Sequence, residues 1–305
     1  MIDVQRARAL HAVATHGSVT AAAAALHVTS SALSQQLAKL EREIGQPLLR
    51  HRGRGVVLTD AGNLLAERTE AILSLITRAE TELDARRGAV TGRMAIAAFA
   101  TADRALLPAA LRALRDQYPQ LRVASQESEP EQALIQLDRG EIDLAVIDEW
   151  SAAARAVPGW LRRQHLFVDV ADLALPAGHP LARDRGAIDL AACADQPWIT
   201  WPPGQFSHDW LVHTLRSLGA EPAIAHTAGE LETILALVAA GLGVALMPRL
   251  GRGPVPEGVA IRTLRPTVTR TVYAAWPADT TGRPAVQAAI AALRECTPPA
   301  IASDE

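Results

Sequence analysis

The sequence lacks most features that mark membrane, secreted and metal-binding proteins. It has two cysteines among 305 residues, Cys193 and Cys296, which lie far apart and match no metal-ligand spacing. No apolar run approaches the roughly 20 residues that span a bilayer, and the N-terminus has no signal-peptide hydrophobic region. We therefore expect a cytoplasmic protein with reduced thiols and no functional disulfide.

Sequence motifs of enzymes are also missing. No glycine-rich phosphate loop follows an expected strand, no Gly-x-Ser-x-Gly motif occurs, and the histidines show no metal spacing. An enzyme is the first alternative to a binding protein, and nothing supports the chemistry it would need. We expect no catalytic residues, no cofactor and no bound metal.

Charge is distributed unevenly along the chain. The whole chain carries a net charge of −3, with 49% hydrophobic and 21% charged residues, which is ordinary for a globular protein. Residues 1–58 hold seven arginines and lysines against three acids, a net charge of +4, so the remainder carries −7. Lys39 is the only lysine. A basic segment joined to an acidic one predicts a DNA-binding module attached to a domain with another task.

Residues 18–44, SVTAAAAALHVTSSALSQQLAKLEREI, predict two short helices with a tight turn between them. Ser18 suits the N-cap of the first helix, and Thr29 or Ser30 suits that of the second. Apolar residues recur at helical spacing in both. In the first helix they are Val19, Ala22, Ala23 and Leu26, and in the second Leu33, Leu37, Leu40 and Ile44.

The opposite face of the second helix is polar and built from short side chains that donate and accept hydrogen bonds. Such a face fits the DNA major groove, which admits one α-helix. The expected DNA-reading residues are Ser30, Ser31, Ser34, Gln35 and Lys39. The alternative is a solvated face on an ordinary small helical bundle.

A basic hairpin and a long helix follow. Gly45 ends the second helix, and the segment 50–58 predicts a winged hairpin in which Arg50, Arg52 and Arg54 contact DNA phosphates. A helix is expected over residues 59–87, with one apolar face. That face predicts a dimerisation helix; the alternative is that it packs on the body of its own chain.

From residue 92 the pattern changes to alternating strands and helices. Met94–Ala100 is a continuous apolar run, typical of a strand buried on both faces of a parallel sheet. A βαβαβ unit is expected through residue 147, and a second α/β unit from about residue 162. Two such lobes leave a cleft between them, where small ligands usually bind.

The chain resembles the LysR-type transcriptional regulators of bacteria along nearly its whole length. The most specific part is HGSVTAAAAALHVTSSALSQQLAKLEREIGQPLLRHRGRGVVLTDAG at 16–62, followed in the family's order by YPQLRV, LDRGEIDLAVI, LALPAGHPLA, PWI and VAAGLGVALMPR. The resemblance implies a winged helix-turn-helix, a linker helix and a two-lobed effector domain like periplasmic binding proteins, in tetramers that bind promoter DNA. A solute-binding protein would share that body but needs export, which the missing signal peptide and basic head oppose.

The resemblance implies a division of the chain into three parts. Residues 1–58 would be the DNA-binding domain, 59–87 the dimerisation helix and 88–305 the effector domain. Within the last, lobe one would comprise about 92–161 plus 267–305, and lobe two about 162–266.

The recognition helix departs from the family. The family commonly reads Ser-Gln-Pro-Ala-Leu-Ser-Arg where this chain has Thr-Ser-Ser-Ala-Leu-Ser-Gln at 29–35. Ser30 and Gln35 therefore occupy the positions of the usual glutamine and arginine readers. Gln35 suits a bidentate contact to adenine. His51 occupies the usual arginine position of the wing, so Arg52 and Arg54 are the preferred phosphate contacts.

The resemblance also implies an effector site in the cleft. Its mapped residues are Thr101, Gln126, Ser128, Trp150, Trp201, Gly204, His226 and Thr227, with Glu129 beside them. Some have structural alternatives: Thr101 as a helix N-cap, His226 as a hydrogen-bonded structural histidine, and Trp201 as core. Glu127, Glu129 and Glu131 bring negative charge to the expected cleft, which favours an amine-bearing or a neutral ligand, such as an aromatic one, over a simple organic acid.

Overall fold

The computed structural model describes residues 2–26, 28–52, 55–85, 89–150, 157–183 and 186–297. The chain divides into two compact units. The first covers Met1–Arg87 and also takes in Asp138–Glu141, and the second covers Gly88–Leu137 and Ile142–Glu305. No helix in the described ranges is both long enough and apolar enough to cross a membrane.

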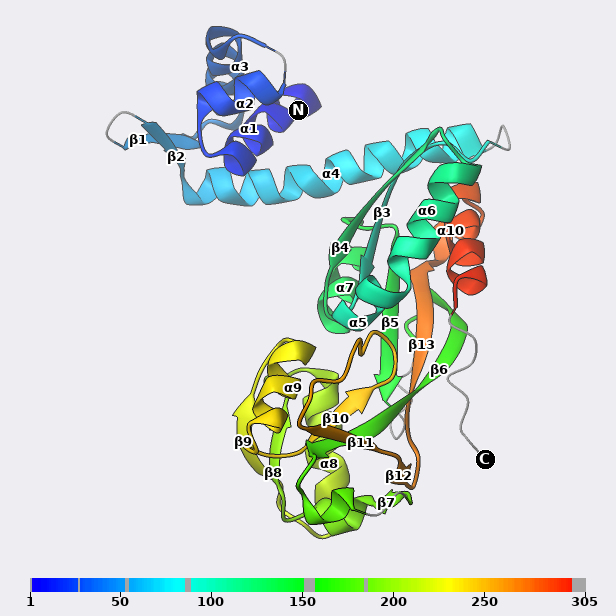
Figure 1. Cartoon of the computed structure of the whole chain (residues 1–305). Coiled ribbons are helices and arrows are strands. Elements are labelled where there is room, and N and C mark those ends of the chain that lie inside the picture. Colours follow the sequence, from blue (N-terminus) through cyan, green and yellow to red (C-terminus); the bar gives the residue numbers. More distant parts are fainter. Residues whose placement is uncertain are drawn as a thin grey trace. The chain divides into compact units, whose positions relative to one another are not determined.

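Three helices form the core of the first unit: α1 (Val4–His16), α2 (Val19–Ala25) and α3 (Ser30–Ile44) (Figure 1). The predicted caps are present, since the Ser18 hydroxyl accepts from the Ala21 N–H and the Thr29 hydroxyl accepts from the Ala32 N–H. Gly45 closes α3 in the left-handed conformation, at φ 79°. The α3 stripe is confirmed, because Leu33, Leu37 and Leu40 are buried.

The wing is a two-stranded antiparallel hairpin, β1 (Leu49–Arg52) and β2 (Gly55–Leu58). Glu41 of α3 holds its base, because one carboxylate oxygen accepts from the backbone N–H groups of Leu48 and Leu49 at 2.8 and 3.0 Å. From the sequence, Glu41 is only one of three acids in this segment. Its structural task is to fix the wing to the recognition helix.

The long helix α4 (Asp60–Ala85) begins where predicted, with the Thr59 hydroxyl accepting from the Gly62 N–H at 3.1 Å. Ala61, Leu65 and Ala66 near its start belong to or pack on the core of the first unit. Further along, large apolar side chains are exposed: Ile72, Leu75, Ile76 and Leu83. The expected apolar side chains are therefore present on this helix and exposed.

The second unit is organised around one mixed sheet. Seven described strands take part, in the order β10–β6–β13–β5–β3–β4, with β11 also paired to β6. The predicted parallel part is confirmed, because β3 (Gly92–Ala98) pairs in parallel with both β4 (Leu121–Glu127) and β5 (Leu144–Trp150). The remaining pairings, of β13 with β5 and β6 and of β6 with β10 and β11, are antiparallel.

Lobe one covers the β3–β4–β5 end of the sheet with helices on both faces. One face packs on α6 (Leu107–Gln117) and α10 (Pro284–Glu295), and the other on α7 (Pro130–Asp138). Figure 1 shows α6 and α10 side by side. Ile96, Ala97 and Ala98 of β3 are fully buried, as the continuous apolar run predicted.

Lobe two contains shorter elements. They are β7 (Ile188–Asp189), β8 (Pro197–Thr200), α8 (Phe206–Ser217), β9 (Ala223–Thr227), α9 (Leu231–Ala239), β10 (Ala245–Pro248), β11 (Val259–Arg262), β12 (Leu264–Arg265) and the 3-10 turns Pro180–Ala182 and Leu190–Cys193. A third 3-10 turn, Ala278–Thr280, follows β13. Trp198 is fully buried at the centre of this lobe.

Two long strands run through both lobes: β6 (Leu161–Pro176) and β13 (Val268–Pro277). They pair antiparallel over nearly the whole length of β13 and lie side by side in Figure 1. The second half of β6 pairs with β10 and β11 of lobe two. These two strands therefore connect the lobes.

The structure corrects the sequence analysis at several short elements. The expected βαβαβ unit has one helix between its first two strands, but the structure has two, the short α5 (Ala100–Ala105) and α6. Strands β11 and β12 were missed, because four- and two-residue strands carry too little periodicity to detect. Thr101 is not an N-cap, since Phe99 occupies the N-cap position of α5.

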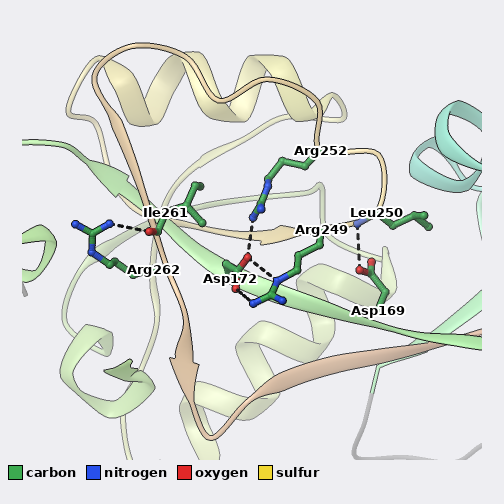
Figure 2. A network of polar contacts seen from close by, with 7 residues as sticks. All are labelled: Asp169, Asp172, Arg249, Leu250, Arg252, Ile261 and Arg262. Carbon is green, nitrogen blue, oxygen red and sulfur yellow. Dashed lines mark hydrogen bonds and ion pairs between the residues drawn. The ribbon is translucent and has the colours of Figure 1, made fainter. Parts of the chain in front are cut away.

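Charged side chains fix the loop after β10 to β6 (Figure 2). Asp172 of β6 accepts two hydrogen bonds from Arg249, both at 2.9 Å, and one from Arg252 at 2.8 Å. Asp169, three residues earlier on the same strand, accepts from the Leu250 N–H at 3.1 Å. Leu250 itself is buried in the hydrophobic cluster of lobe one, so this loop joins the lobes.

Substituting Gly62 by alanine tests the packing of α4 against the wing. A Cβ at Gly62 would lie 2.1 Å from the carbonyl oxygen of Leu48. Alanine favours a helix over glycine by up to about 1 kcal/mol, so a stabilised G62A variant would contradict the close approach. We expect the free energy of unfolding to fall by about 1–3 kcal/mol instead, since the backbone must shift.

Asn63→Ala, one residue further along the helix and exposed, is the control and should leave the stability unchanged. All six tryptophans lie in the second unit, so a urea transition seen by far-UV circular dichroism but not by tryptophan fluorescence reports the first.

Candidate functional site

The predicted DNA-reading side chains share one exposed face of α3. Ser30, Ser31, Ser34, Gln35 and Lys39 are all exposed. The Ser34 hydroxyl donates to the Ser30 carbonyl at 2.8 Å, which leaves its lone pairs as acceptors. No described group hydrogen-bonds to the Gln35 amide, so both its oxygen and its nitrogen are available to a base edge.

A groove of about 440 Å³ runs beside this face. Its lining includes Asp3, Gln5 and Arg6 at the start of α1 and Gln35, Gln36 and Lys39 of α3. Arg6 is held in place by an ion pair with Glu43 and by Asp3 at 3.5 Å. In the wing, Arg50 is exposed. The side chain of Arg52 and the whole of Arg54 lie outside the described residues.

The second unit contains a cavity where lobe one faces lobe two. Its volume is about 40 Å³. We call it the inner cavity. It lies at the carboxyl ends of β3 and β5, the edge of a parallel sheet where ligands usually bind. Its lining comprises Phe99, Ala100, Thr101, Glu129, Asp148, Trp150, Trp201, Gln205, Ser207 and Arg270.

A larger cavity adjoins the inner one and shares Ala100, Thr101 and Trp201 with it. We call it the outer cavity; its volume is about 330 Å³. Its remaining lining residues are Arg104, Glu127, Gly229, Glu230, Leu231 and Glu232. Arg104 forms an ion pair with Glu232 at 2.7 Å and donates to the Gly251 carbonyl at 3.1 Å.

Arg270 of β13 is the centre of the inner cavity's polar network. Its guanidinium, only 5% exposed, donates to Asp148 at 2.9 Å, to Asp169 at 2.9 Å and to the Thr101 hydroxyl at 2.8 Å. It also lies 4.9 Å from the centre of the Phe99 ring and 5.5 Å from that of Trp150. Because these partners engage most of its N–H groups, the Arg270 guanidinium has little capacity for further hydrogen bonds.

Burial raises the pKa of Glu129 to about 7, with further increases from Asp148, Glu131 and Glu127 that outweigh the lowering by Arg270. Burial also raises the pKa of Asp148, although its ion pair with Arg270 opposes that rise. A carboxyl group that titrates near neutral pH in a cavity is a common feature of functional sites.

The structure brings together only part of the predicted effector set. Thr101, Trp150 and Trp201 line the inner cavity, as does Glu129. Ser128 is buried beside it, with its N–H donating to the Ala98 carbonyl at 2.9 Å. The exposed residues that line neither cavity are Gln126, Gly204, His226 and Thr227. The ring of His226 has no hydrogen-bond partner among the described residues, unlike the structural histidine considered as its alternative.

Other lining residues were not anticipated. Arg270 reaches the cavity from a strand that follows Thr101 by 169 positions, and Asp148, Phe99, Gln205 and Ser207 carried no motif. Gln205 precedes α8 without capping it, and its amide oxygen is buried with no partner among the described residues. These residues come from distant segments of the chain, so their proximity is visible only in the folded structure.

The two cysteines lie in separate surroundings. Cys193 is fully buried in the lobe-two cluster, and burial, with a smaller effect of Asp189, raises its pKa to about 11. Cys296 packs on the lobe-one cluster. Within the described ranges, no group of three histidine, cysteine or acidic side chains could hold a metal ion.

The first unit is a helix-turn-helix with a wing, and the second has two lobes with an internal cleft. Together these features define a DNA-binding regulator with a ligand-binding domain. Comparison with known families agrees. Residues 4–63 match the family described as "Bacterial regulatory helix-turn-helix protein, lysR family", and residues 87–297 match the "LysR substrate binding domain". The chain belongs to the LysR-type transcriptional regulators, and it is not an enzyme.

Named relatives extend this match. A probable hydrogen peroxide-inducible genes activator of Streptomyces viridosporus is 33% identical over 79% of this chain and 76% of its own length. The transcriptional dual regulator OxyR of Escherichia coli is 31% identical over 86% and 85%. Full-length CbnR complexed with its target DNA shares the fold, with a TM-score of 0.71 at 22% identity over 96% of this chain and 99% of CbnR.

The raised pKa of Glu129 predicts a loss of stability as the pH rises. Its carboxyl stays protonated in the folded protein up to about pH 7, whereas in the unfolded chain it ionises near pH 4.5. The folded state therefore binds more protons in this window, and the free energy of unfolding falls across it. Allowing for partial exposure, we expect a contribution on the order of 1–2 kcal/mol.

Glu129→Gln isolates this contribution. The variant should gain stability relative to the unsubstituted protein on going from pH 5 to pH 8, because glutamine mimics the neutral acid. Urea unfolding followed by tryptophan fluorescence measures it. Glu295→Gln, an exposed acid on α10, is the control; if both variants show the same pH dependence, the Glu129 carboxyl does not titrate abnormally.

Proposed function

We propose that this regulator binds a promoter site through the α3 face and the wing, and that a small molecule in the cleft between the lobes controls this binding. The observation that carries the proposal is the exposed, hydrogen-bond-competent face of α3 beside a basic wing. The proposed DNA contacts are Ser30, Ser31, Ser34, Gln35, Lys39, Arg50, Arg52 and Arg54. Their roles require cytoplasmic access to DNA.

The proposed domain boundaries are those expected from the sequence: residues 1–58, 59–87 and 88–305. The family matches at 4–63 and 87–297 support this division. The proposed effector contacts keep Thr101, Trp150 and Trp201 and add Glu129, Asp148 and Gln205, because all six line the inner cavity. The other expected contacts line neither cavity and are less favoured: Gln126, Ser128, Gly204, His226 and Thr227.

Peroxide sensing is a second candidate, since the Streptomyces viridosporus relative is named as a probable hydrogen peroxide-inducible genes activator. A peroxide-reactive cysteine must be an accessible thiolate. Cys193 is fully buried with a pKa raised to about 11, and Cys296 packs on a different hydrophobic cluster. These surroundings favour a bound ligand over thiol oxidation as the signal.

We further propose that α4 forms a dimer interface, as a step toward a tetramer. Leu75 and Leu83 are 57% and 65% exposed and lie two helical turns apart on a face that also carries Ile72 and Ile76. Apolar side chains at such spacing are typical of paired helices. Leaving them in water is unfavourable for an isolated chain.

DNA footprinting on the region just upstream of the gene tests the DNA-binding residues. We expect protection of two or more half-sites about one helical turn apart. Gln35→Ala should lose about 1–3 kcal/mol of discrimination between this site and random DNA. Arg50→Ala should weaken binding to both and reduce the salt dependence by about one counterion.

Asn63→Ala, exposed on α4, is the matched control and should leave the footprint unchanged. If Gln35→Ala binds the site and random DNA with unchanged preference, the α3 face does not read bases.

The mass of the protein in solution tests the α4 interface. Light scattering after size exclusion should give a multiple of the 32.4 kDa chain. The double variant Leu75→Asp, Leu83→Asp should lower that mass, because each copy would bring charge into an apolar seam. Glu67→Ala with Glu70→Ala, both exposed on the same helix, is the control. An unaltered mass for the leucine variant would place the interface elsewhere.

A further inference from the structure

We propose that the cleft binds a small organic cation, an amine or a guanidine carried on a compact apolar or aromatic body. This inference rests on the proposed ligand-binding role of the cleft and specifies its chemistry. It follows from which hydrogen-bonding groups around the inner and outer cavities are already engaged and which remain available.

The positive charges of the cleft are neutralised by the protein itself. Arg270 donates to Asp148, Asp169 and Thr101, and Arg104 is held by Glu232 and the Gly251 carbonyl. A ligand carboxylate would have to displace one of these partners. Displacing a buried aspartate would leave that aspartate unpaired in the interior, which is strongly unfavourable. The two arginines therefore do not form an anion site.

The available groups are acceptors. No described side chain or backbone group donates a hydrogen bond to the carboxylates of Glu127 or Glu129. The Gln205 amide oxygen is buried at the inner cavity and lacks a described partner. A buried acceptor without a donor is costly. A ligand that brings several N–H groups would satisfy Glu129 and Gln205 together.

The charge of the lining has the sign that such a ligand needs. Five carboxylates line the two cavities against two arginines: Glu127, Glu129, Asp148, Glu230 and Glu232. Asp169 lies behind Arg270. A carboxylate entering this surface meets repulsion, and a cation meets attraction in a partly buried setting where screening by water is weak.

Aromatic rings provide the apolar contact. Trp201 lines both cavities and is half-buried. Phe99 and Trp150 already lie against a cation, the guanidinium of Arg270, while Trp210 lies 5.4 Å from Trp150. Trp201 has no such described partner. Its ring therefore offers a ligand cation the same favourable contact.

The cavity sizes suit a head group and a body. One water needs roughly 10–15 Å³ of such space, so the inner cavity of about 40 Å³ accommodates an ammonium or amidinium group. The outer cavity of about 330 Å³ accommodates a ring or a short chain. Because Glu129 ionises near neutral pH and faces Asp148, Glu127, Glu131 and Arg270, binding of a cation should strengthen as the pH rises through 7.

The test is a matched set of ligands on one carbon skeleton: 2-phenylethylamine, 2-phenylethanol and phenylacetate, with agmatine as a guanidine. Each is titrated into the full-length protein by calorimetry, and the tryptophan fluorescence of the second unit gives an independent reading. We expect the amine or the guanidine to bind at least about tenfold more tightly than the alcohol and the carboxylate. A preference for phenylacetate, equal binding of the amine, the alcohol and the carboxylate, or no binding of either cation at millimolar concentration would overturn the proposal.

Two variants locate the effect. Glu129→Gln should weaken amine binding about tenfold or more and bring it close to that of the alcohol. Gln205→Met, which removes the unpaired acceptor, should weaken the amine and leave the alcohol unchanged. Glu295→Gln is the control and should bind all ligands as the unsubstituted protein does. If both cavity variants bind the amine normally, the cation does not occupy this site.

The footprint separates this inference from the proposed function. If phenylacetate rather than an amine alters the protected tract, the cleft controls DNA binding but the ligand class is wrong. If an amine binds the cleft and no ligand alters the tract, the cation site stands and control through the cleft fails.

Discussion

The second unit depends on one buried positive charge. Arg270 lies on β13, the strand shared by both lobes, between Asp148 of β5 and Asp169 of β6. Each aspartate alone would be a buried, uncompensated charge, and the arginine alone would be the same. Together they hold three neighbouring strands in register at the point where the lobes meet. The contact to Thr101 extends this network to α5, and so to the wall of the cavity.

The first unit is held together by local contacts, and for that reason its fold could be predicted from the sequence. The caps at Ser18 and Thr29 and the left-handed Gly45 lie within a few positions of the helices that they start or end. The stripe of Leu33, Leu37 and Leu40 repeats at helical spacing. Glu41 was the exception, because the turn at Gly45 could be predicted but nothing in the sequence identifies this carboxylate as the acceptor for the Leu48 and Leu49 N–H groups.

The cleft could be predicted only in part, since its geometry arises from distant segments. The apolar run of β3 and the tryptophans at 150 and 201 were visible as features, and both tryptophans line the inner cavity. The pairing of Arg270 with Asp148 spans 122 positions, and no periodicity connects them. His226 and Thr227 were carried over by resemblance, but they lie on an exposed strand of lobe two.

The loop after β10 gives the two lobes a mechanical link besides the crossing strands. Leu250 is buried in the hydrophobic cluster of lobe one, and Gly251 touches α5 so closely that a Cβ there would lie 2.6 Å from the Thr101 carbonyl oxygen. Arg249 and Arg252 fasten the same loop to Asp172 (Figure 2). The two lobes therefore cannot move apart independently of this loop. Any widening of the cleft must either extract Leu250 from its pocket or carry along α5, the helix that bears Thr101.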